Sequence, residues 1–271
     1  AFRSREIVDE AIFEGWADDV DEDVKEILRR TLFEVVYGYK GKEEKPPQTV
    51  LLGAVEIAYL SKAVKEIVAE AAGDAKTAKG LAADWAKAHA KNLKVISEGA
   101  KLPAGLTGAL FGRMVTSDPR ANIEAPVHVA HAFTVHAEEA ESDYFIAADD
   151  LAREEDTGAD TIQETELTSG LFYGYVVVDL PGLIDNLGGD VALAGEVLHN
   201  LTYLIAEVSP GAKLGSTAPY SRASFMLLES GDRQPRSLAE AFRTPCKAET
   251  GQAVAALCNH LAALDAAYDT G

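Results

Sequence analysis

The chain has 271 residues, of which 47% are hydrophobic, enough for a folded globular protein of one large domain or one domain with an insertion. Its 44 aspartate and glutamate residues outnumber 25 lysine and arginine residues, so the formal net charge is -19. Phosphate contacts draw their affinity from clustered cations, and this balance therefore argues against a broadly basic nucleic-acid-binding domain.

Cysteine usage and apolar runs bound the class of protein further. Cys246 and Cys258 lie twelve residues apart without a Cys-x-x-Cys unit, which indicates neither a disulfide framework nor a zinc knuckle. No apolar run approaches the roughly 18 residues of a membrane span, and no signal-peptide pattern is present. We expect a cytoplasmic protein with reduced thiols and no membrane partner.

The first part of the chain, residues 1–104, has helical periodicity. Residues 4–38 predict helices interrupted by an acidic patch at residues 18–23. We interpret this patch as a solvated turn and a helix N-terminus, where carboxylates suit the helix dipole. Apolar residues at near-helical spacing predict further helices over 49–72 and about 76–95.

From Pro126 the hydrophobic period changes from helical to two, which predicts a strand over 126–136. A second strand is predicted over 171–179, and its continuous apolar residues favour a central place in a sheet. The 34 residues between them, 137–170, carry two short arms around an acidic tip with Gly158. This pattern predicts a protruding β-hairpin.

The C-terminal part predicts a helix over 191–208, a strand over 223–229 and a last helix over about 252–267. The spacing of Ser237 and Glu240 predicts a capping box that begins an additional helix. The order of elements predicts an α+β fold, close to an RRM-like (ferredoxin-like) fold that lacks its opening strand.

Three histidines raise the possibility of a metal site. His128, His131 and His136 with Asp149 or Asp150 would supply a common zinc or iron ligand set. On a strand, however, His131 faces away from the other two, and eight residues separate His128 from His136 by roughly 27 Å. We therefore favour strand histidines that make local hydrogen bonds.

The paired carboxylates Asp149 and Asp150 could also support general acid-base or metal-assisted phosphoryl chemistry. Adjacent residues on a hairpin arm point to opposite faces, so a polar hairpin edge is the better interpretation. No GxSxG, Walker A or GxGxxG pattern occurs in the sequence.

What remains are features suited to binding a single strand of nucleic acid. Arg113 and Lys213 each sit in a glycine-containing turn, where the backbone can approach a phosphate. Several apolar residues in irregular or hairpin segments could stack on bases or wedge between them, although for each one burial in the core is the preferred interpretation, since isolated apolar residues usually pack. These residues are Met114, Tyr144, Phe145, Ile146 and Ile162.

Seven sequence blocks occur in an order typical of one family. They are GRMVTSD (112–118), HAFTVH (131–136), DYFIAADDL (143–151), TSGLFYGY (168–175), DNLGG (185–189), VSPGAK (208–213) and SLAEAF (237–242). These blocks resemble the CasC backbone subunit of type I-E CRISPR Cascade complexes, in the RAMP superfamily. The segment KPPQTVLLGAVEIAYL also resembles the helical region of that family.

The resemblance implies a hand-shaped protein that binds RNA without catalysis. Residues 1–104 would form helical fingers and residues 105–271 an RRM-like palm, with a thumb hairpin at about 137–170. Several copies, together with other Cascade subunits, would line up as a homo-oligomer along one CRISPR RNA and present it for pairing with target DNA in antiviral defence. No cofactor or metal is expected.

The resemblance also implies roles for individual residues. The thumb of one copy would press on the guide at regular intervals and flip out a base. The family opens with a strand and a basic Ser-Gln-x-Leu-Lys-Arg type run before the position of Ala1, so we expect these, and a final strand, to be missing. Met114, Tyr144, Phe145, Ile146 and Ile162 would flank the displaced base, and Arg113, Thr116 and Lys213 would meet the guide backbone.

Two other functions stay open from the sequence. One is a metal-dependent RNA endonuclease of the same superfamily, acting through an acidic hairpin residue such as Asp149 or Asp150. The other is a zinc enzyme built on the three histidines.

Overall fold

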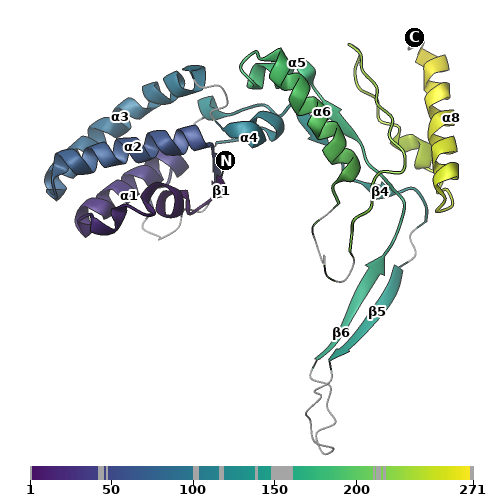
Figure 1. The fold of residues 1–271 in the computed structure, drawn as a ribbon, viewed down its shortest axis with the longest axis horizontal. Helices are drawn as coiled ribbons and strands as arrows, with labels where there is room; N and C mark the ends of the chain where they lie inside the picture. The colour runs from purple at the N-terminus through teal and green to yellow at the C-terminus, as the bar shows by residue number, and fades with distance from the viewer. Residues whose placement is uncertain are drawn as a thin grey trace, which may run out of the picture. The chain divides into compact units, whose positions relative to one another are not determined.

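The structure, a computed structural model, describes residues 2–41, 46, 48–99, 104–115, 119–137, 140–147, 161–209, 211, 215 and 218–268 (Figure 1). The chain divides into two compact units. Unit 1 comprises Ala1–His128 and Val177–Thr202, and unit 2 comprises Val129–Val176 and Tyr203–Gly271. The boundary predicted near residue 104 therefore falls inside unit 1.

Unit 1 is mainly helical, with helices in each of the three segments where the period predicted them. Residues 50–52, included in a predicted helix, instead form a strand that pairs antiparallel with residues 2–4. The elements are β1 (Phe2–Ser4), the π-helical turn η1 (Val8–Phe13), the 3-10 turn η2 (Ala17–Asp19), α1 (Glu22–Tyr37), β2 (Val50–Leu52), α2 (Ala54–Ala71), α3 (Ala75–Gly99), α4 (Gly105–Phe111), the 3-10 turn η3 (Pro119–Ala121) and α5 (Leu180–Asn186).

The core of unit 1 lies between η1 and the helices α1, α2 and α3. Leu28 and Leu32 repeat every fourth residue along α1, so they occupy one helical face, and both are 1% exposed. Asp21 caps the helix, because its Oδ1 accepts hydrogen bonds from the N–H groups of Asp23 and Val24. The interpretation of the acidic patch as a turn and helix N-terminus is confirmed.

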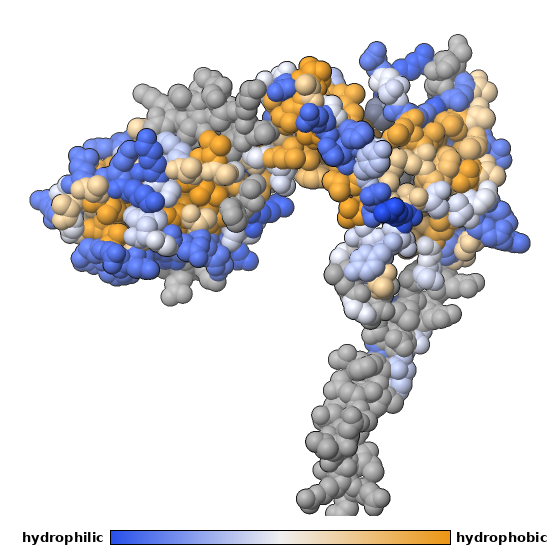
Figure 2. Space-filling view, viewed as in Figure 1, coloured by the Kyte–Doolittle hydropathy of each residue, from blue (hydrophilic) through white to orange (hydrophobic). Residues whose placement is uncertain are grey.

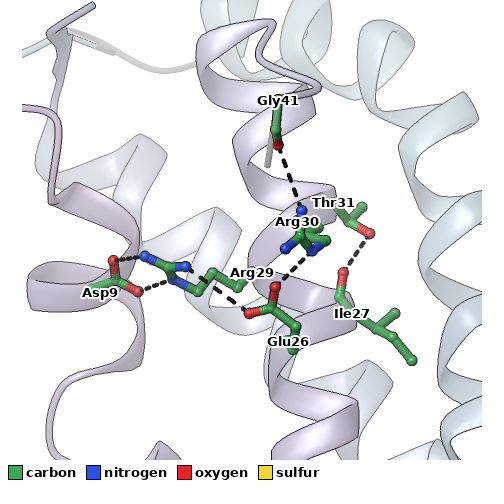
Figure 3. A network of polar contacts seen from close by, with 7 residues as sticks. All are labelled: Asp9, Glu26, Ile27, Arg29, Arg30, Thr31 and Gly41. Carbon is green, nitrogen blue, oxygen red and sulfur yellow. Dashed lines mark hydrogen bonds and ion pairs between the residues drawn. The ribbon is translucent and has the colours of Figure 1, made fainter. Parts of the chain in front are cut away.

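A polar network ties η1 to α1 (Figure 3). The Arg29 guanidinium donates from Nε and Nη2 to the two carboxylate oxygens of Asp9, at 2.8 and 3.0 Å. Along α1, Arg30 Nε lies 2.6 Å from Glu26 Oε1. The bidentate Arg29–Asp9 pair fixes the orientation of both side chains, as the planar fork of arginine favours.

The described strands form four sheets of two strands each. The predicted strand over 126–136 is split into β3 (Val127–Val129) and β4 (Phe133–Thr134), and the one over 171–179 into β7 (Phe172–Tyr173) and β8 (Val176–Val178). β3 pairs with β8, and β4 pairs antiparallel with β7. The prediction of a central strand at 171–179 is wrong for the described part of the chain, because there each piece has a single partner strand.

A long hairpin forms in unit 2, inside the range 137–170 predicted for it. β5 (Ala140–Ala147) pairs antiparallel with β6 (Thr161–Thr168), and Figure 1 shows the two strands side by side. The predicted acidic tip falls in residues 148–160, which lie outside the described residues.

A second core holds unit 2 together around α8 (Thr250–Tyr268) and the 3-10 turn η4 (Ala239–Phe242). The rings of Phe133, Tyr173 and Phe242 contact one another, with centroids 5.4 Å apart for Phe133–Tyr173 and 5.5 Å for Tyr173–Phe242. Leu238 N–H donates to the Tyr173 hydroxyl at 3.1 Å, which joins η4 to β7. The helix α8 confirms the prediction of a helix over about 252–267, and α6 (Val191–Glu207) confirms the one predicted over 191–208.

Two predictions in the C-terminal part are wrong. Residues 223–229 form no strand: Leu228 is 72% exposed, and the segment is held by ion pairs of Arg236 with Glu229 and with Asp265 of α8. Exposed apolar side chains of unit 2 appear as orange surface in Figure 2. A β-prone segment needs a partner strand to pair with, and the described chain offers this one none.

The expected capping box at Ser237 and Glu240 begins no α-helix. Ser237 Oγ accepts a hydrogen bond from Ala239 N–H at 3.2 Å, and the chain makes the single turn η4. Glu240 pairs with Arg243 instead of reaching back to the start of a helix. Of the helices in the described residues, none has the length and apolar character needed to cross a membrane.

Candidate functional site

The loop after α4 makes a sharp turn that requires glycine. Gly112 has a φ of +71°, in the left-handed region that side chains disfavour. A Cβ atom at this position would lie 2.7 Å from the carbonyl oxygen of Ile123. Any other residue would therefore push residues 112 and 123 apart.

Arg113, predicted to meet an RNA backbone, has its side chain buried. It is 8% exposed, and its Nη1 lies 2.7 Å from both Oε1 and Oε2 of Glu56. Its Nε donates to the carbonyl of Ala121 at 2.9 Å. The turn predicted at Arg113 is present, but the guanidinium is engaged inside unit 1 and is not displayed on the surface. Contact with RNA stays a prediction that would require this pair to open.

Glu56, the partner of Arg113, was not identified from the sequence. It lies in the first turn of α2, is 4% exposed, and also accepts a hydrogen bond from Gly53 N–H at 2.9 Å. A buried carboxylate must be paired to offset its lost hydration. One signal could have found it: Glu56, Leu60, Ala63, Val64 and Ile67 share the buried face of α2, so a carboxylate interrupts an apolar stripe.

Met114 is exposed, so burial in the core, the interpretation that its residue type favours, does not apply to it. At 78% exposure it is the most exposed large hydrophobic residue in the described part of the chain. Its neighbours are fixed on both sides. Arg113 and Ile123 exchange backbone hydrogen bonds of 2.9 Å, and Val115 N–H donates to Asn122 Oδ1 at 2.6 Å. An apolar side chain thus projects into solvent from a backbone held in place.

Asn186 ties the two ends of this loop region to α5. Its Nδ2 donates to the carbonyls of Ala109 at 3.0 Å and Glu124 at 2.9 Å. The side chain belongs to the DNLGG block, whose Gly188 and Gly189 both have positive φ values. From the sequence, this block contributed only to the family resemblance. The hydrogen bonds that Asn186 makes to the loop were not predicted.

The hairpin carries the other predicted apolar contacts. Tyr144 on β5 is 60% exposed and lies opposite Glu164 in the ladder. Phe145 pairs in register with Gln163, and Ile146 with Ile162, while the side chains of these residues lie outside the described part. Thr116 and Lys213, predicted at the guide backbone, also lie outside the described residues, as do Asp149 and Asp150.

Two of the three histidines, His128 and His136, make local hydrogen bonds within the protein, as the preferred interpretation held. His128 Nε2 lies 2.9 Å from the carbonyl of Ala125. His136 Nε2 accepts from Leu171 N–H at 3.1 Å, which leaves Nδ1–H to donate to the Ala137 carbonyl at 2.7 Å. Within the described ranges, no three His, Cys, Asp or Glu residues gather in an arrangement that could hold a metal ion.

A small cavity adjoins the Glu56–Arg113 pair. Its volume is about 40 Å³, and its walls include Val36, Leu52, Tyr59 and His89. This space admits a few water molecules at most, so it is too small for a nucleotide or a base. The parts of this region able to meet a large ligand are therefore the exposed ones, above all Met114.

Comparisons with protein families and with solved structures both gave matches to this chain. A protein-family profile described as CT1975-like protein matches residues 1–271. A solved chain described as "CRISPR RNA-guided surveillance complex, pre-nicking" matches with a TM-score of 0.76 and 23% sequence identity, over 99% of this chain and 74% of that one. At this identity the likeness establishes the fold alone.

A second solved chain, described as "CRISPR RNA-guided surveillance complex", matches with a TM-score of 0.51 and 27% identity. The match covers 67% of this chain and 66% of that one. A search of curated proteins gave no match.

Proposed function

The chain belongs to the CT1975-like protein family, and we propose that it is a guide-RNA-binding backbone subunit of a Cascade-type CRISPR surveillance complex. The observation that carries the proposal is the coverage: the family profile matches the whole sequence, and a chain of such a complex shares its fold over 99% of the residues. The resemblance to a CRISPR protein, drawn from seven short blocks, is thereby confirmed at the level of the family.

Finer features of the proposal rest on those blocks. They are the identity as a type I-E CasC subunit, an RRM-like palm, and assembly of several copies along one CRISPR RNA beside other Cascade subunits. In this function the guide reads target DNA by base pairing, and the protein only holds the guide. No step of it requires a catalytic group, so we propose a non-catalytic role.

Met114 and Tyr144 are the residues that we propose to contact the guide. Both are apolar or aromatic and largely exposed, at 78% and 60%. A flexible, polarizable methionine can wedge between bases, and an aromatic ring can stack on a base of any sequence. Their contacts need no clustered cations, which suits a chain with a net charge of -19.

Copurification tests the function directly. The protein is expressed with a CRISPR RNA and the other subunits of its complex, and the purified material is analysed for RNA and for copies per guide. We expect several copies on each RNA and protection of the RNA at a regular spacing. Recovery of the protein as an RNA-free monomer in the presence of all partners would refute the proposal.

The same assembly tests the endonuclease alternative. Complementary RNA is added with Mg²⁺, and we expect no cleavage. Cleavage at regular spacing that is lost in Asp149→Ala or Asp150→Ala would replace the scaffold with an enzyme. Both residues lie outside the described part of the chain, so no observation of the site favours this function.

The proposed contacts predict an effect on target capture. We expect Met114→Ala and Tyr144→Ala each to weaken binding of complementary single-stranded DNA to the assembled complex by about five- to tenfold, because each removes a group that wedges or stacks. Electrophoretic mobility shifts at several DNA concentrations give the dissociation constants.

Matched truncations of exposed residues serve as controls. Val55→Ala removes a 45% exposed apolar side chain from α2, and Tyr268→Ala removes a 71% exposed tyrosine from α8. Both should leave DNA binding within twofold. Equal losses in the controls and the test variants would count against a specific role for Met114 and Tyr144.

A further inference from the structure

We propose that the buried Glu56–Arg113 ion pair is a positioning device that holds Met114 in the place where it meets the guide. This inference rests on the proposed guide-binding function and adds to it two residues that do not touch RNA themselves. It follows from the juxtaposition of an anchored arginine and an exposed methionine at consecutive positions.

The pair joins segments that are far apart in the sequence. Arg113 Nη1 bonds both carboxylate oxygens of Glu56 at 2.7 Å, and the two side chains are 4% and 5% exposed. The same Nη1 lies 3.3 Å from the carbonyl of Leu51 in β2. Nε reaches Ala121 in η3, and Glu56 reaches back to Gly53 at the start of α2. One guanidinium thus locks the loop onto a strand, a helix N-terminus and a 3-10 turn.

The position of Met114 is coupled to this anchor through a single peptide unit. Consecutive Cα atoms are fixed about 3.8 Å apart, so a shift of the Arg113 backbone also moves the point from which the Met114 side chain projects. On its other side, Val115 is 7% exposed, packs in the helical core and is held by Asn122. An exposed side chain that must enter a stack of bases needs placement to about 0.5 Å, and two buried neighbours supply it.

An ion pair suits positioning better than it suits stability. Burying two charges costs hydration that their attraction barely offsets, and apolar residues of similar volume often stabilise a fold as well or better. Apolar packing does not fix the orientation of a side chain as hydrogen bonds between charged groups do. The planar guanidinium of Arg113 holds Nη1 on Glu56 and Nε on the carbonyl of Ala121 at the same time. Lysine, a point charge with one nitrogen on a flexible stem, does not reproduce this geometry.

Fluorescence of the guide tests this inference in the assembled complex. CRISPR RNAs carry a single 2-aminopurine at successive positions, and the fluorescence of this base rises when it leaves the stack. We expect maxima at regular spacing with the wild-type protein. In the double variant Glu56→Met with Arg113→Met, we expect the maxima to fall at least threefold, while the melting temperature and the amount of bound RNA stay near those of the wild type.

Arg113→Lys provides a second variant that keeps the charge and loses the planar guanidinium with its Nε donor to Ala121, and it should lower the maxima in the same way. Asp9→Asn is the matched control, because it breaks the bidentate Asp9–Arg29 pair of the same unit, which joins η1 to α1 (Figure 3). It should leave the fluorescence pattern unchanged. Unchanged maxima in both Arg113 variants, or equal losses in Asp9→Asn, would overturn the inference.

Met114→Ala separates this inference from the function on which it rests. If Met114→Ala removes the maxima and the Arg113 variants keep them, Met114 contacts the guide and only the positioning role fails. If no RNA is bound by the wild-type assembly, the proposed function fails before the positioning role is reached. Loss of the maxima in Met114→Ala and in both Arg113 variants, with melting temperatures preserved, supports both.

Discussion

Tyr37 links the stability of unit 1 to pH at the scale of a single residue. The side chain is 7% exposed, its ring packs edge-on against Phe33 at 5.8 Å, and its hydroxyl lies 3.5 Å from the carbonyl of Ser4. Burial raises the pKa of Tyr37 from 10.0 to about 12, because the charged phenolate loses hydration. The folded protein therefore favours the neutral phenol, which the unfolded chain loses near pH 10.

This shift predicts a loss of stability in alkali. The contribution of Tyr37 is fully present below pH 10 and disappears as the pH rises through 12, since the unfolded state releases its proton first. We expect the free energy of unfolding to fall about 1 to 2 kcal/mol more in the wild type than in Tyr37→Phe between pH 9.5 and 11.5. Urea denaturation at each pH measures it, and parallel curves would contradict it.

Individual residues differ in how far the sequence reveals them. Met114 could be identified because an apolar residue follows a glycine turn in a polar loop, and its 78% exposure agrees with that interpretation. The same glycine turn placed Arg113 where its backbone could approach a phosphate, but its side chain is buried. Its burial depends on Glu56, 57 residues earlier, and no local pattern of residue types reports a pairing across that distance.

At the scale of one element, α1 depends on its first residues. Asp21 Oδ1 accepts hydrogen bonds from Asp23 N–H at 3.0 Å and Val24 N–H at 3.3 Å, two donors that otherwise have no partner within the helix. We expect Asp21→Ala to lower the free energy of unfolding by about 1 kcal/mol, as lost N-caps do. Chemical denaturation followed by circular dichroism at 222 nm measures the change.

The acidic patch supplies its own control for the cap. Asp19 is exposed and precedes the helix without bonding its first turn, so Asp19→Ala should change the stability little. An equal effect of both substitutions would mean that the total charge of the patch, and not the cap, stabilises this end of α1.

Helices were predicted better than strands for a physical reason. The period that buries Leu28 and Leu32 lies within one helix, so the sequence of α1 alone reports it. A strand is defined by its partner. Residues 171–179 have the composition of a continuous strand, yet they break into β7 and β8, and residues 223–229 have no partner strand among the described residues. Composition measures the tendency to extend, and the partner decides whether a ladder forms.

At the scale of the whole molecule, the division into units follows contacts between distant segments. Unit 1 includes α5, because Asn186 bonds the carbonyls of Ala109 and Glu124 and Leu183 is fully buried. The boundary near residue 104 was predicted from the helical periodicity of residues 1–104, and such a period reports only the local secondary structure. Contacts between residues about 70 positions apart leave no trace in that period.

Net charge governs the encounter of the whole molecule with RNA. A chain with a formal charge of -19 repels a polyanion at long range, and the contacts proposed for Met114 and Tyr144 act only after the surfaces meet. Salt screens the long-range term, since the Debye length falls from about 30 Å at 0.01 M to about 10 Å at 0.1 M. We therefore expect the association rate constant for guide RNA to rise over this range of salt.

This predicted rise of the association rate constant with salt is opposite to the behaviour of a basic nucleic-acid-binding protein, whose association slows as salt increases. Stopped-flow measurements with fluorescently labelled guide RNA give the rate constant at each salt concentration. Asp18→Asn with Asp19→Asn removes two negative charges far along the chain from the proposed contacts, and it should speed association at 0.01 M more than at 0.1 M. A rate constant that falls with salt would mean that a local group of cations governs the encounter in spite of the net charge.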